Sequence, residues 1–579
     1  MISRAFVRPM LPRRAWSRLT DLVVFAAVLA VFLGLLNLGQ TWLGPFQPAA
    51  KISRSPWALP AYAAASLARI GIAYALSLLF ALAYGYAAAR SPRAERVLVP
   101  LLDILQSIPV LSFLPGVMLA MVALFPRRQL GIELGSILLI FTGQAWNIAF
   151  SFYSSLKSIP RELDDAARVY RFSRWQRFTE LELPYAAIGL VWNSMMSVAG
   201  GWFFLMACEM FVLGPRDFRL PGLGSYLQIA AGAGDTQAIL WGLAAMIGII
   251  VLLDVLVWRP VIAWADKFKF EQVESAVAAR SAVLELLRRS GAFALLYRKV
   301  IRPAGERLTL TFARSAGHAF LPVPRMRPAK WRSWLGRAVA LLGLAALGYA
   351  VWRASLELVK LNGEEIEEIA RGAGLTFLRV NAALLLGALW AVPAGVAVGS
   401  SPRLARFAQP LAQIAASVPA TALFPVVLLV LIREGGGMGL ASLALMLLGT
   451  QWYILFNVIA GAMAIPTDLR EAAEVFHFGR WERWRRLILP GIFPYLVTGM
   501  VTAAGGAWNA SIVAEYFHFK GQTLSTAGLG AVISRATDAG QYHVLLAATV
   551  VMAAIVVAIN RLFWQRLYRL AESRFKLET

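Results

Sequence analysis

Long apolar runs alternate with short polar segments along the whole chain. An α-helix needs about 20 apolar residues, at about 1.5 Å each, to cross a bilayer. Runs of that length centre near residues 30, 76, 112, 145, 198, 250, 347, 385, 420, 450, 502 and 555. The pattern therefore predicts an all-α, polytopic membrane protein with about six spans in each half and about twelve in total.

One polar segment between the spans occurs twice. Its copies align without a gap: IPRELDDAARVYRFSRWQRFTELELP at residues 159–184 and IPTDLREAAEVFHFGRWERWRRLILP at residues 465–490. The same shift of 306 positions superposes Trp146 on Trp452, Trp202 on Trp508 and Glu209 on Glu515. A second pair of similar segments, SPRAERVLVPLLDILQSIP and SPRLARFAQPLAQIAASVP, lies upstream at a shift of 310 positions.

A repeat of about half the chain indicates a duplicated module. Solenoid proteins repeat in much shorter units, of roughly 20–50 residues. We therefore divide the chain into a first module at residues 1–266, a basic linker at 267–331 and a second module at 332–579. Residues 281–300 of the linker are basic and apolar at helical spacing, which fits a helix on the inner membrane surface or a solvated tether equally well.

Composition narrows the class of protein. The chain is 59% apolar and 15% charged, whereas soluble domains carry about 25% charged residues. The net charge of +24 lies in arginines beside the spans rather than in one basic domain, so membrane topology explains it better than nucleic-acid binding. A single cysteine, Cys208, excludes an intramolecular disulfide, and four scattered histidines predict no metal site.

Arginines also predict the orientation, because positive charge is retained on the cytoplasmic side of a membrane. Five arginines precede Asp21, the first acidic residue, which places the amino terminus inside. An even number of spans in each half then puts both repeated segments, the linker and the carboxyl terminus inside, and the acidic loop at 360–372 outside. The first apolar run is predicted to be a retained span rather than a signal peptide, because it shows no small-residue cleavage pattern.

The repeated segment has the features of a docking element. In each copy a short helix with an acid-Ala-Ala sequence precedes a turn and an Arg-Trp-x-Arg motif, and Leu-Pro follows. Trp175 and Trp481 lie in these motifs, and exposed aromatic and arginine side chains are typical interface anchors. A juxtamembrane belt of tryptophan and arginine is the alternative, but it does not require two copies of equal length.

These segments resemble the cytoplasmic loop of permease subunits of ATP-binding-cassette (ABC) importers, which reads E-A-A, three residues, G, nine residues, I-x-L-P. Arg171 and His477 occupy the glycine position. The SPR segments, Ala-Cys-Glu-Met at 207–210 and Val-Ala-Glu-Tyr at 513–516 are similar to the duplicated, fused form of nitrate/sulfonate/taurine-type anion permeases. The residues that match the coupling loops are Asp165, Ala166, Ala167, Arg174, Trp175, Arg177, Glu471, Ala472, Ala473, Arg480, Trp481 and Arg483.

The resemblance implies two tandem type I importer domains in the bacterial inner membrane. It also implies two ABC ATPase subunits or domains inside, and a periplasmic or lipid-anchored substrate-binding protein outside. The phosphate-binding motif G-x-x-x-x-G-K-[ST] is missing from the sequence. We therefore expect a permease that is not itself an enzyme and binds no cofactor, with ATP and Mg²⁺ held by the partner ATPase.

Ionisable residues within the spans are the next candidates for function, because burying a charge in a membrane is costly. Arg69 and Arg379 occupy similar positions in the two halves, as do Glu209 and Glu515. We predict one Arg–Glu pair in each half, since pairing lowers the desolvation cost. A structural clamp is favoured over a place on the substrate path, because a carboxylate there would repel an anion.

Polar and aromatic residues at membrane depth suit a substrate pathway, where hydrogen-bond donors can solvate an oxyanion. They equally suit contacts between helices. The candidates are Gln144, Trp146, Asn147, Trp202, Gln451, Trp452, Tyr453, Trp508 and Asn509.

The sequence thus predicts a pseudo-dimeric permease for a small anion such as nitrate, a sulfonate or bicarbonate. Fused permeases for thiamine or ferric iron are the main rivals within importers. A secondary transporter with internal repeats and a non-transporting membrane scaffold are the alternatives from other classes. The secondary transporter has no use for paired docking segments.

Overall fold

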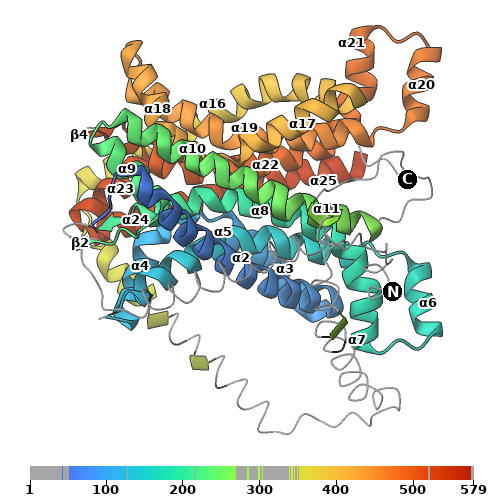
Figure 1. The fold of residues 1–579 in the computed structure, drawn as a ribbon, viewed down its shortest axis with the longest axis horizontal. Helices are drawn as coiled ribbons and strands as arrows, with labels where there is room; N and C mark the ends of the chain where they lie inside the picture. The colour runs from blue at the N-terminus through green and yellow to red at the C-terminus, as the bar shows by residue number, and fades with distance from the viewer. Residues whose placement is uncertain are drawn as a thin grey trace, which may run out of the picture.

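The structure is a computed structural model that describes residues 51–126, 128–213, 216–268, 351–519 and 522–574, with a few isolated positions elsewhere. These ranges form a bundle of long helices with two short β-hairpins at one end (Figure 1). The span expected near residue 30, nearly all of the linker and much of the run near residue 347 lie outside the described residues.

The described part of the first module consists mainly of long helices, the last of which continues through a π-helical turn. Its helices and strands are η2 (Pro56–Ala58), α2 (Leu59–Arg90), α3 (Pro92–Ser107), η3 (Val110–Phe113), α4 (Leu114–Leu124), α5 (Leu130–Lys157), α6 (Arg161–Val169), α7 (Arg174–Arg177), η4 (Phe178–Glu182), α8 (Leu183–Glu209), β1 (Val212–Leu213), β2 (Arg216–Asp217), α9 (Leu223–Gly232), α10 (Thr236–Leu253), η5 (Asp254–Trp258), α11 (Arg259–Ala265) and η6 (Asp266–Phe268).

The second module repeats this order, except that η2, η3 and η6 have no counterparts among its described residues. It comprises α16 (Gly363–Ser400), α17 (Pro402–Ser417), α18 (Ala420–Arg433), α19 (Met438–Ala464), α20 (Thr467–Val475), α21 (Arg480–Arg483), η8 (Trp484–Ile488), α22 (Leu489–Ala514), β3 (Tyr516–Phe519), β4 (Gln522–Ser525), α23 (Leu529–Ala539), α24 (Tyr542–Ile559), η9 (Asn560–Trp564) and α25 (Gln565–Arg574).

Eight helices among the described residues are long and apolar enough to cross a membrane, four in each module. They agree with the predicted spans near residues 76, 145, 198, 250, 385, 450, 502 and 555. Their bounds are Pro56–Arg90, Leu130–Lys157, Arg174–Glu209, Thr236–Ala265, Gly363–Ser400, Met438–Ala464, Arg480–Ala514 and Tyr542–Ala571.

The apolar runs near residues 112 and 420 differ from the expected straight spans. Each is broken at an X-Pro step, where Ile108 and Val418 adopt extended backbone conformations before Pro109 and Pro419. Proline disfavours the helical conformation in the residue before it, so the helix ends there. In the second module the two pieces, Arg403–Ser417 and Ala420–Leu428, are bent by 81°.

Glycines let the long helices of each module approach closely. A side chain at Gly85 of α2 would lie 3.1 Å from the Ala149 carbonyl of α5, and one at Gly395 of α16 would lie 3.2 Å from the Leu455 carbonyl of α19. Small residues at helix contacts are a common way to pack helices within a bilayer, where the hydrophobic effect does not drive association.

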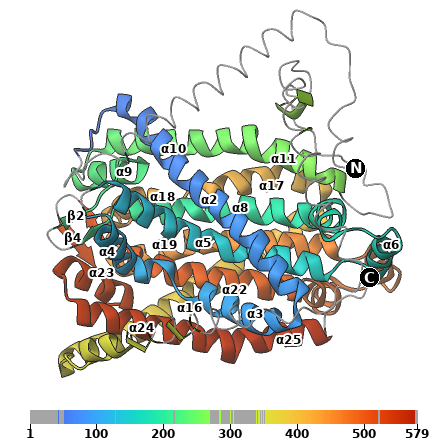
Figure 2. The same ribbon diagram turned by 90° about the horizontal axis from the view of Figure 1, so that it is seen from below.

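The modules pack reciprocally (Figure 2). One apolar core contains residues of both modules. Helix α24 contacts α3 and η3 of the first module, and α10 contacts α17 and α18 of the second. The Leu111 N–H donates to Asn509 Oδ1 at 3.3 Å, and the Thr549 hydroxyl donates to the Ser112 carbonyl at 3.1 Å. The broken helix of the first module is therefore held by the second module.

Both repeated segments project from the same end of the bundle. Figure 1 shows α20 and α21 at the upper right and α6 and α7 at the lower right, while both hairpins, α9 and α23 lie at the left. We call these the loop end and the hairpin end.

Candidate functional site

The two repeated loops have the same backbone conformation. Each short helix ends in a Schellman turn, in which the Phe172 N–H donates to the Ala167 carbonyl at 2.9 Å and the Phe478 N–H donates to the Ala473 carbonyl at 3.0 Å. Arg171 and His477 are the left-handed residues of these turns, with φ of 52° and 54°. The turn therefore forms in both loops although neither has the glycine of the related importer motif.

Each loop continues directly into a span. In the first module, Ser173 caps α7: its hydroxyl accepts the Gln176 N–H at 3.2 Å, and Gln176 Oε1 accepts the Ser173 N–H at 2.9 Å. Helix α7 then runs through a π-helical turn into α8 as one stretch of 36 residues, Arg174–Glu209. A force on α7 would therefore act on the whole helix.

Apolar side chains cover the tips of the loops. Val169 and Tyr170 are 78% and 76% exposed, and their equivalents Val475 and Phe476 are 73% and 74% exposed. Trp481 is 77% exposed. Exposed apolar patches of this kind mark interaction surfaces. We call these five residues the loop apolar surface.

Sequence reasoning missed four of these five residues. The repeat of Val-Tyr and Val-Phe at equivalent positions after the Ala-Ala pairs was the signal that could have found them. Among the predicted coupling residues, Asp165 is exposed, Ala167 and Ala473 are buried, and Trp175 is half-buried with its ring 6.0 Å from that of Phe178. The remaining predicted coupling residues, Ala166, Arg174, Arg177, Glu471, Ala472, Arg480 and Arg483, lie on the same two loops.

A buried ion network ties the first loop to the bundle. Arg177 pairs with Asp164 of α6, and its Nε lies 3.0 Å from Oε1 of Glu182, which is completely buried. Glu182 also pairs with Arg90 at the end of α2. These ion pairs thus join α7 and the following π-helical turn, η4, to α6 and to the end of α2.

The second loop lacks this network. Ile488 and Ser400 occupy the positions equivalent to Glu182 and Arg90. Arg483 instead lies 3.3 Å from Glu474, at the surface of the same loop. The two loops therefore match in backbone conformation but differ in their ion pairs: that of Arg483 lies at the surface, whereas Arg177 reaches a buried carboxylate.

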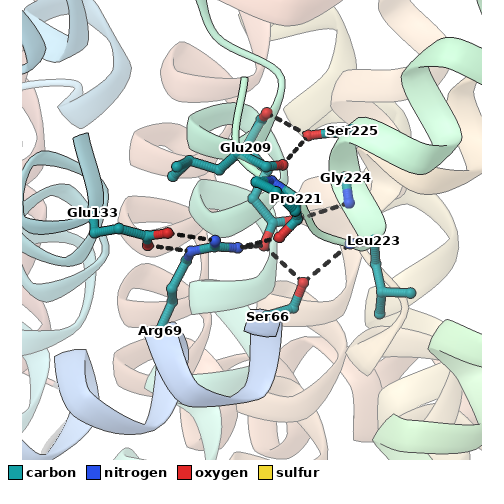
Figure 3. Close-up of polar contacts among 9 residues, drawn as sticks. Ser66, Arg69, Glu133, Glu209, Pro221, Leu223, Gly224 and Ser225 are labelled. Carbon is teal, nitrogen blue, oxygen red and sulfur yellow. Dashed lines mark hydrogen bonds and ion pairs between the residues drawn. The ribbon is translucent and has the colours of Figure 1, made fainter. Parts of the chain in front are cut away.

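Near the hairpin end, Arg69 is buried between two carboxylates (Figure 3). Its Nη1 donates to Oε1 of Glu209 at 2.8 Å, and Nε and Nη2 donate to the two oxygens of Glu133 at 2.6 and 2.8 Å. Nη1 also donates to the Pro221 carbonyl at 2.9 Å. The predicted partners Arg69 and Glu209 are thus in contact, and Glu133 is a third member.

Glu209 is itself held by further donors. The Ser66 hydroxyl donates to its Oε1 at 2.7 Å and the Gly224 N–H to its Oε2 at 2.8 Å. A side chain at Gly222 would collide with the Glu209 carboxylate. The Gly-Leu-Gly motif therefore brings the start of α9 against the ion cluster.

The second module has a related but simpler cluster. Arg379 Nη1 donates to Glu515 Oε1 at 2.7 Å, and its Nη2 donates to the Ala527 carbonyl at 2.8 Å. Gly439 occupies the position equivalent to Glu133. One arginine thus faces two carboxylates in the first module and one carboxylate in the second. These contacts fit a clamp between helices in each half.

The predicted pathway residues fall into two groups. Four of the first group are buried: Trp202, Trp508, Gln144 and Gln451. The other three make contacts within their own module: Trp146 packs against Phe80, Asn147 donates to Ser197, and Trp452 packs against Trp390. Tyr453 and Asn509 instead lie between the modules, against Gly200 and Leu111. The contacts of these two residues across the modules suit a shared pathway.

A cavity of about 370 Å³ lies between the modules at the hairpin end. None of the predicted pathway residues lines it. Its walls come from η3, α4, the end of α8, β1 and α9 in the first module, and from the end of α22, β3 and α23 in the second.

Individual relatives match shorter parts of the chain. The nitrate import permease protein NrtB of Leptolyngbya laminosa is 25% identical over 32% of this chain and 62% of its own length. The bicarbonate transport system permease protein CmpB of Synechocystis sp. is 28% identical over 24% and 48%. The taurine transport system permease protein TauC of Escherichia coli is 26% identical over 40% and 90%. The chain thus spans about three fifths of the nitrate permease.

The model of one family matches twice, at residues 73–259 and 383–577, which is well over half of the chain. The two matches fall in the two modules that the repeat defines, and each includes one of the loops. The chain therefore belongs to the family of binding-protein-dependent transport system inner membrane components, and carries two copies of its characteristic domain.

Proposed function

We propose that this chain is the membrane-spanning permease of an ATP-driven ABC importer. The observation that supports this most directly is the pair of loops at one end of the bundle, each with an exposed apolar tip and each continuous with a span. Two equal docking loops suit a partner with two equal sites. On this proposal the two modules form the whole translocation pathway as a pseudo-dimer.

The partners follow from the same proposal. Two ABC ATPase subunits or domains bind the loop end, which faces the cytoplasm, and they hold the ATP and Mg²⁺. Both termini face the cytoplasm of a bacterial inner membrane. A periplasmic or lipid-anchored binding protein delivers the cargo at the hairpin end.

The loops pass closure of the ATPase dimer to the bundle as rigid-body motion, the usual form of a hinge or shear transition. The continuous helix from Arg174 to Glu209 supports this role, because it joins the loop end to the ion cluster of Arg69. In this proposal the Arg–Glu clusters are clamps that keep the spans of each module together while the modules move.

The proposed cargo is a small anion. The relatives named above are permeases for nitrate, bicarbonate and taurine, and all three compounds carry an anionic oxygen group. The sequence of this chain is less than 30% identical to each of these relatives, so the choice among them needs measurement.

Replacing the loop apolar surface tests the proposed docking. We expect the double variant Tyr170→Asp and Phe476→Asp to remain in the membrane but to lose the ATPase on affinity purification, because two charges would be buried in the interface. Trp57→Asp is the matched control, since Trp57 is 91% exposed at the hairpin end. An ATPase that stays bound to the double variant would contradict the proposal.

Reconstitution tests the transport activity. The complex, with its binding protein, should hydrolyse ATP faster with one of nitrate, bicarbonate, sulfonates, thiamine or ferric iron, and it should contain one permease chain for two ATPase domains. Uptake that follows an ion gradient without ATP would instead identify a secondary transporter.

A further inference from the structure

The cavity at the hairpin end is lined by residues of both modules. Most of its lining positions occur in pairs that differ by the repeat shift of 306 residues, one from each module. These pairs are Ala207 and Val513, Met210 and Tyr516, Phe211 and Phe517, Val212 and His518, and Gln228 and Ser534.

The chemistry of the two walls differs. The first module contributes apolar side chains such as Leu114 and Phe211. On the second wall, Asp538 Oδ2 accepts the Tyr516 hydroxyl at 2.8 Å and lies 3.1 Å from His518 Nε2. The duplicated positions have therefore diverged, and the second module supplies a carboxylate that the first does not.

Two acceptors at this cavity are available to a donor. Oε1 of Gln228, on the first wall, is buried and has no hydrogen-bond partner in the described part of the chain. Both bonds to the Asp538 carboxylate go to Oδ2, and its side chain is 33% exposed, so Oδ1 is accessible to a ligand. A buried acceptor without a donor is unfavourable, so a ligand that brings N–H groups would stabilise the wall that carries Gln228 and could also bind Asp538.

The lining also disfavours a bare anion. No lysine or arginine occurs among the described residues that line the cavity, whereas Asp538 places a carboxylate there. The volume of about 370 Å³ lies in the range of about 300–1,000 Å³ that is usual for small-molecule sites. An inorganic oxyanion would contact only part of such a cavity.

We propose that this cavity binds the ammonium group of a small organic zwitterion. Its N–H groups donate to Asp538 and Gln228, and its carbon chain lies against Phe211, Phe517 and Leu114. The site deepens the proposed function, because it selects an amine-bearing organic anion over an inorganic one. The inference rests on the proposed cargo class, but binding to the purified chain needs neither an ATPase nor a binding protein.

Four probes of graded chemistry test the site on the purified full-length chain by calorimetry. Taurine and 3-aminopropanesulfonate carry an ammonium group, ethanesulfonate has the same sulfonate without it, and nitrate is inorganic. We expect the two amines to bind at least tenfold more tightly than ethanesulfonate and nitrate. Equal binding of ethanesulfonate, tight binding of nitrate alone, or no binding of either amine would overturn the proposal.

Variants assign the binding to these residues. Asp538→Asn and Gln228→Leu should each weaken amine binding at least tenfold, with unchanged thermal unfolding to show that the chain is folded. Asp235→Asn is the matched control, because Asp235 also lies at the hairpin end but pairs with Arg54 outside the cavity. Unchanged amine binding by both cavity variants would refute the site even if taurine binds. Loss of transport in the complex with amine binding retained would count against the importer function alone.

Discussion

Arg171 and His477 lie at equivalent positions of the two loops and both adopt the left-handed backbone conformation. This conformation costs an L-residue other than glycine roughly 1–2 kcal/mol. The turns therefore hold these residues in place against a local preference, which indicates that the surrounding loop determines the conformation.

Glycine at these positions should stabilise the turns. We expect Arg171→Gly and His477→Gly each to stabilise the protein by about 1 kcal/mol, because glycine adopts positive φ without a steric penalty. Val at either position should destabilise it by a similar amount. Thermal unfolding of the purified chain measures both effects. A lower melting temperature for the glycine variants would mean that the side chains make stabilising contacts of their own.

The two buried arginines should differ in importance. Arg69→Met leaves two carboxylates without their cation, and removing one partner of a buried pair costs about 3–5 kcal/mol. Arg379→Met leaves one carboxylate, and the side chain of Arg379 is 17% exposed against 1% for Arg69. We therefore expect the first variant to lower the melting temperature and the membrane yield more than the second.

A reversal of this order would contradict the idea that the second carboxylate makes Arg69 the more important cation. The variant Glu133→Gln tests that carboxylate directly. It should destabilise the chain, because it removes one of the two carboxylates that accept hydrogen bonds from Arg69.

The one-sided ion network predicts different dynamics in the two loops. Because Glu182 joins Arg177 and Arg90, amide hydrogens of residues 161–182 should exchange more slowly than those of residues 467–488. Glu182→Gln should remove this difference in exchange rate, because Arg177 and Arg90 would then repel each other without a carboxylate between them. Glu474→Gln is the control, because Glu474 pairs only at the surface. Equal protection of both loops in the unmodified chain would show that the network does not restrain the first.

Acid should weaken a contact beside the first loop. Hydrogen bonds from Lys157 and Tyr153 hold the pKa of Glu95 below its usual value of 4.5. A carboxyl group with a lowered pKa stabilises the folded state above its usual pKa, and this contribution is lost as the pH falls through the folded-state pKa. The melting temperature of Glu95→Gln should therefore lie below that of the unmodified chain at neutral pH and approach it in acid. A difference that does not change with pH would contradict this assignment.

Repetition in the sequence predicted the features that the modules share. The loops, the pairs of Arg69 with Glu209 and Arg379 with Glu515, and eight of the spans follow from patterns that occur in both halves. Hydropathy alone did not predict the breaks in the runs near residues 112 and 420, because an average over 20 residues does not register a single proline at 109 or 419.

Features that occur in only one half were harder to predict. Glu133 faces Arg69, but the position equivalent to Glu133 in the second module is Gly439. Comparison of the two halves therefore did not identify Glu133 as a partner of Arg69. Asp538 and His518 of the cavity have Gly232 and Val212 as equivalents. Their proximity depends on β3 and α23 packing together, which no local pattern indicates.

The reciprocal packing of α24 on α3 and of α10 on α17 has a consequence for how such a chain can change. In an assembly of two identical subunits, one substitution in the gene would change both subunits, and therefore both sides of the interface, at once. A fused gene removes this restriction, because each half always meets the same, separately encoded neighbour. Glu133 and Asp538 are residues that a chain free to vary on one side alone can acquire.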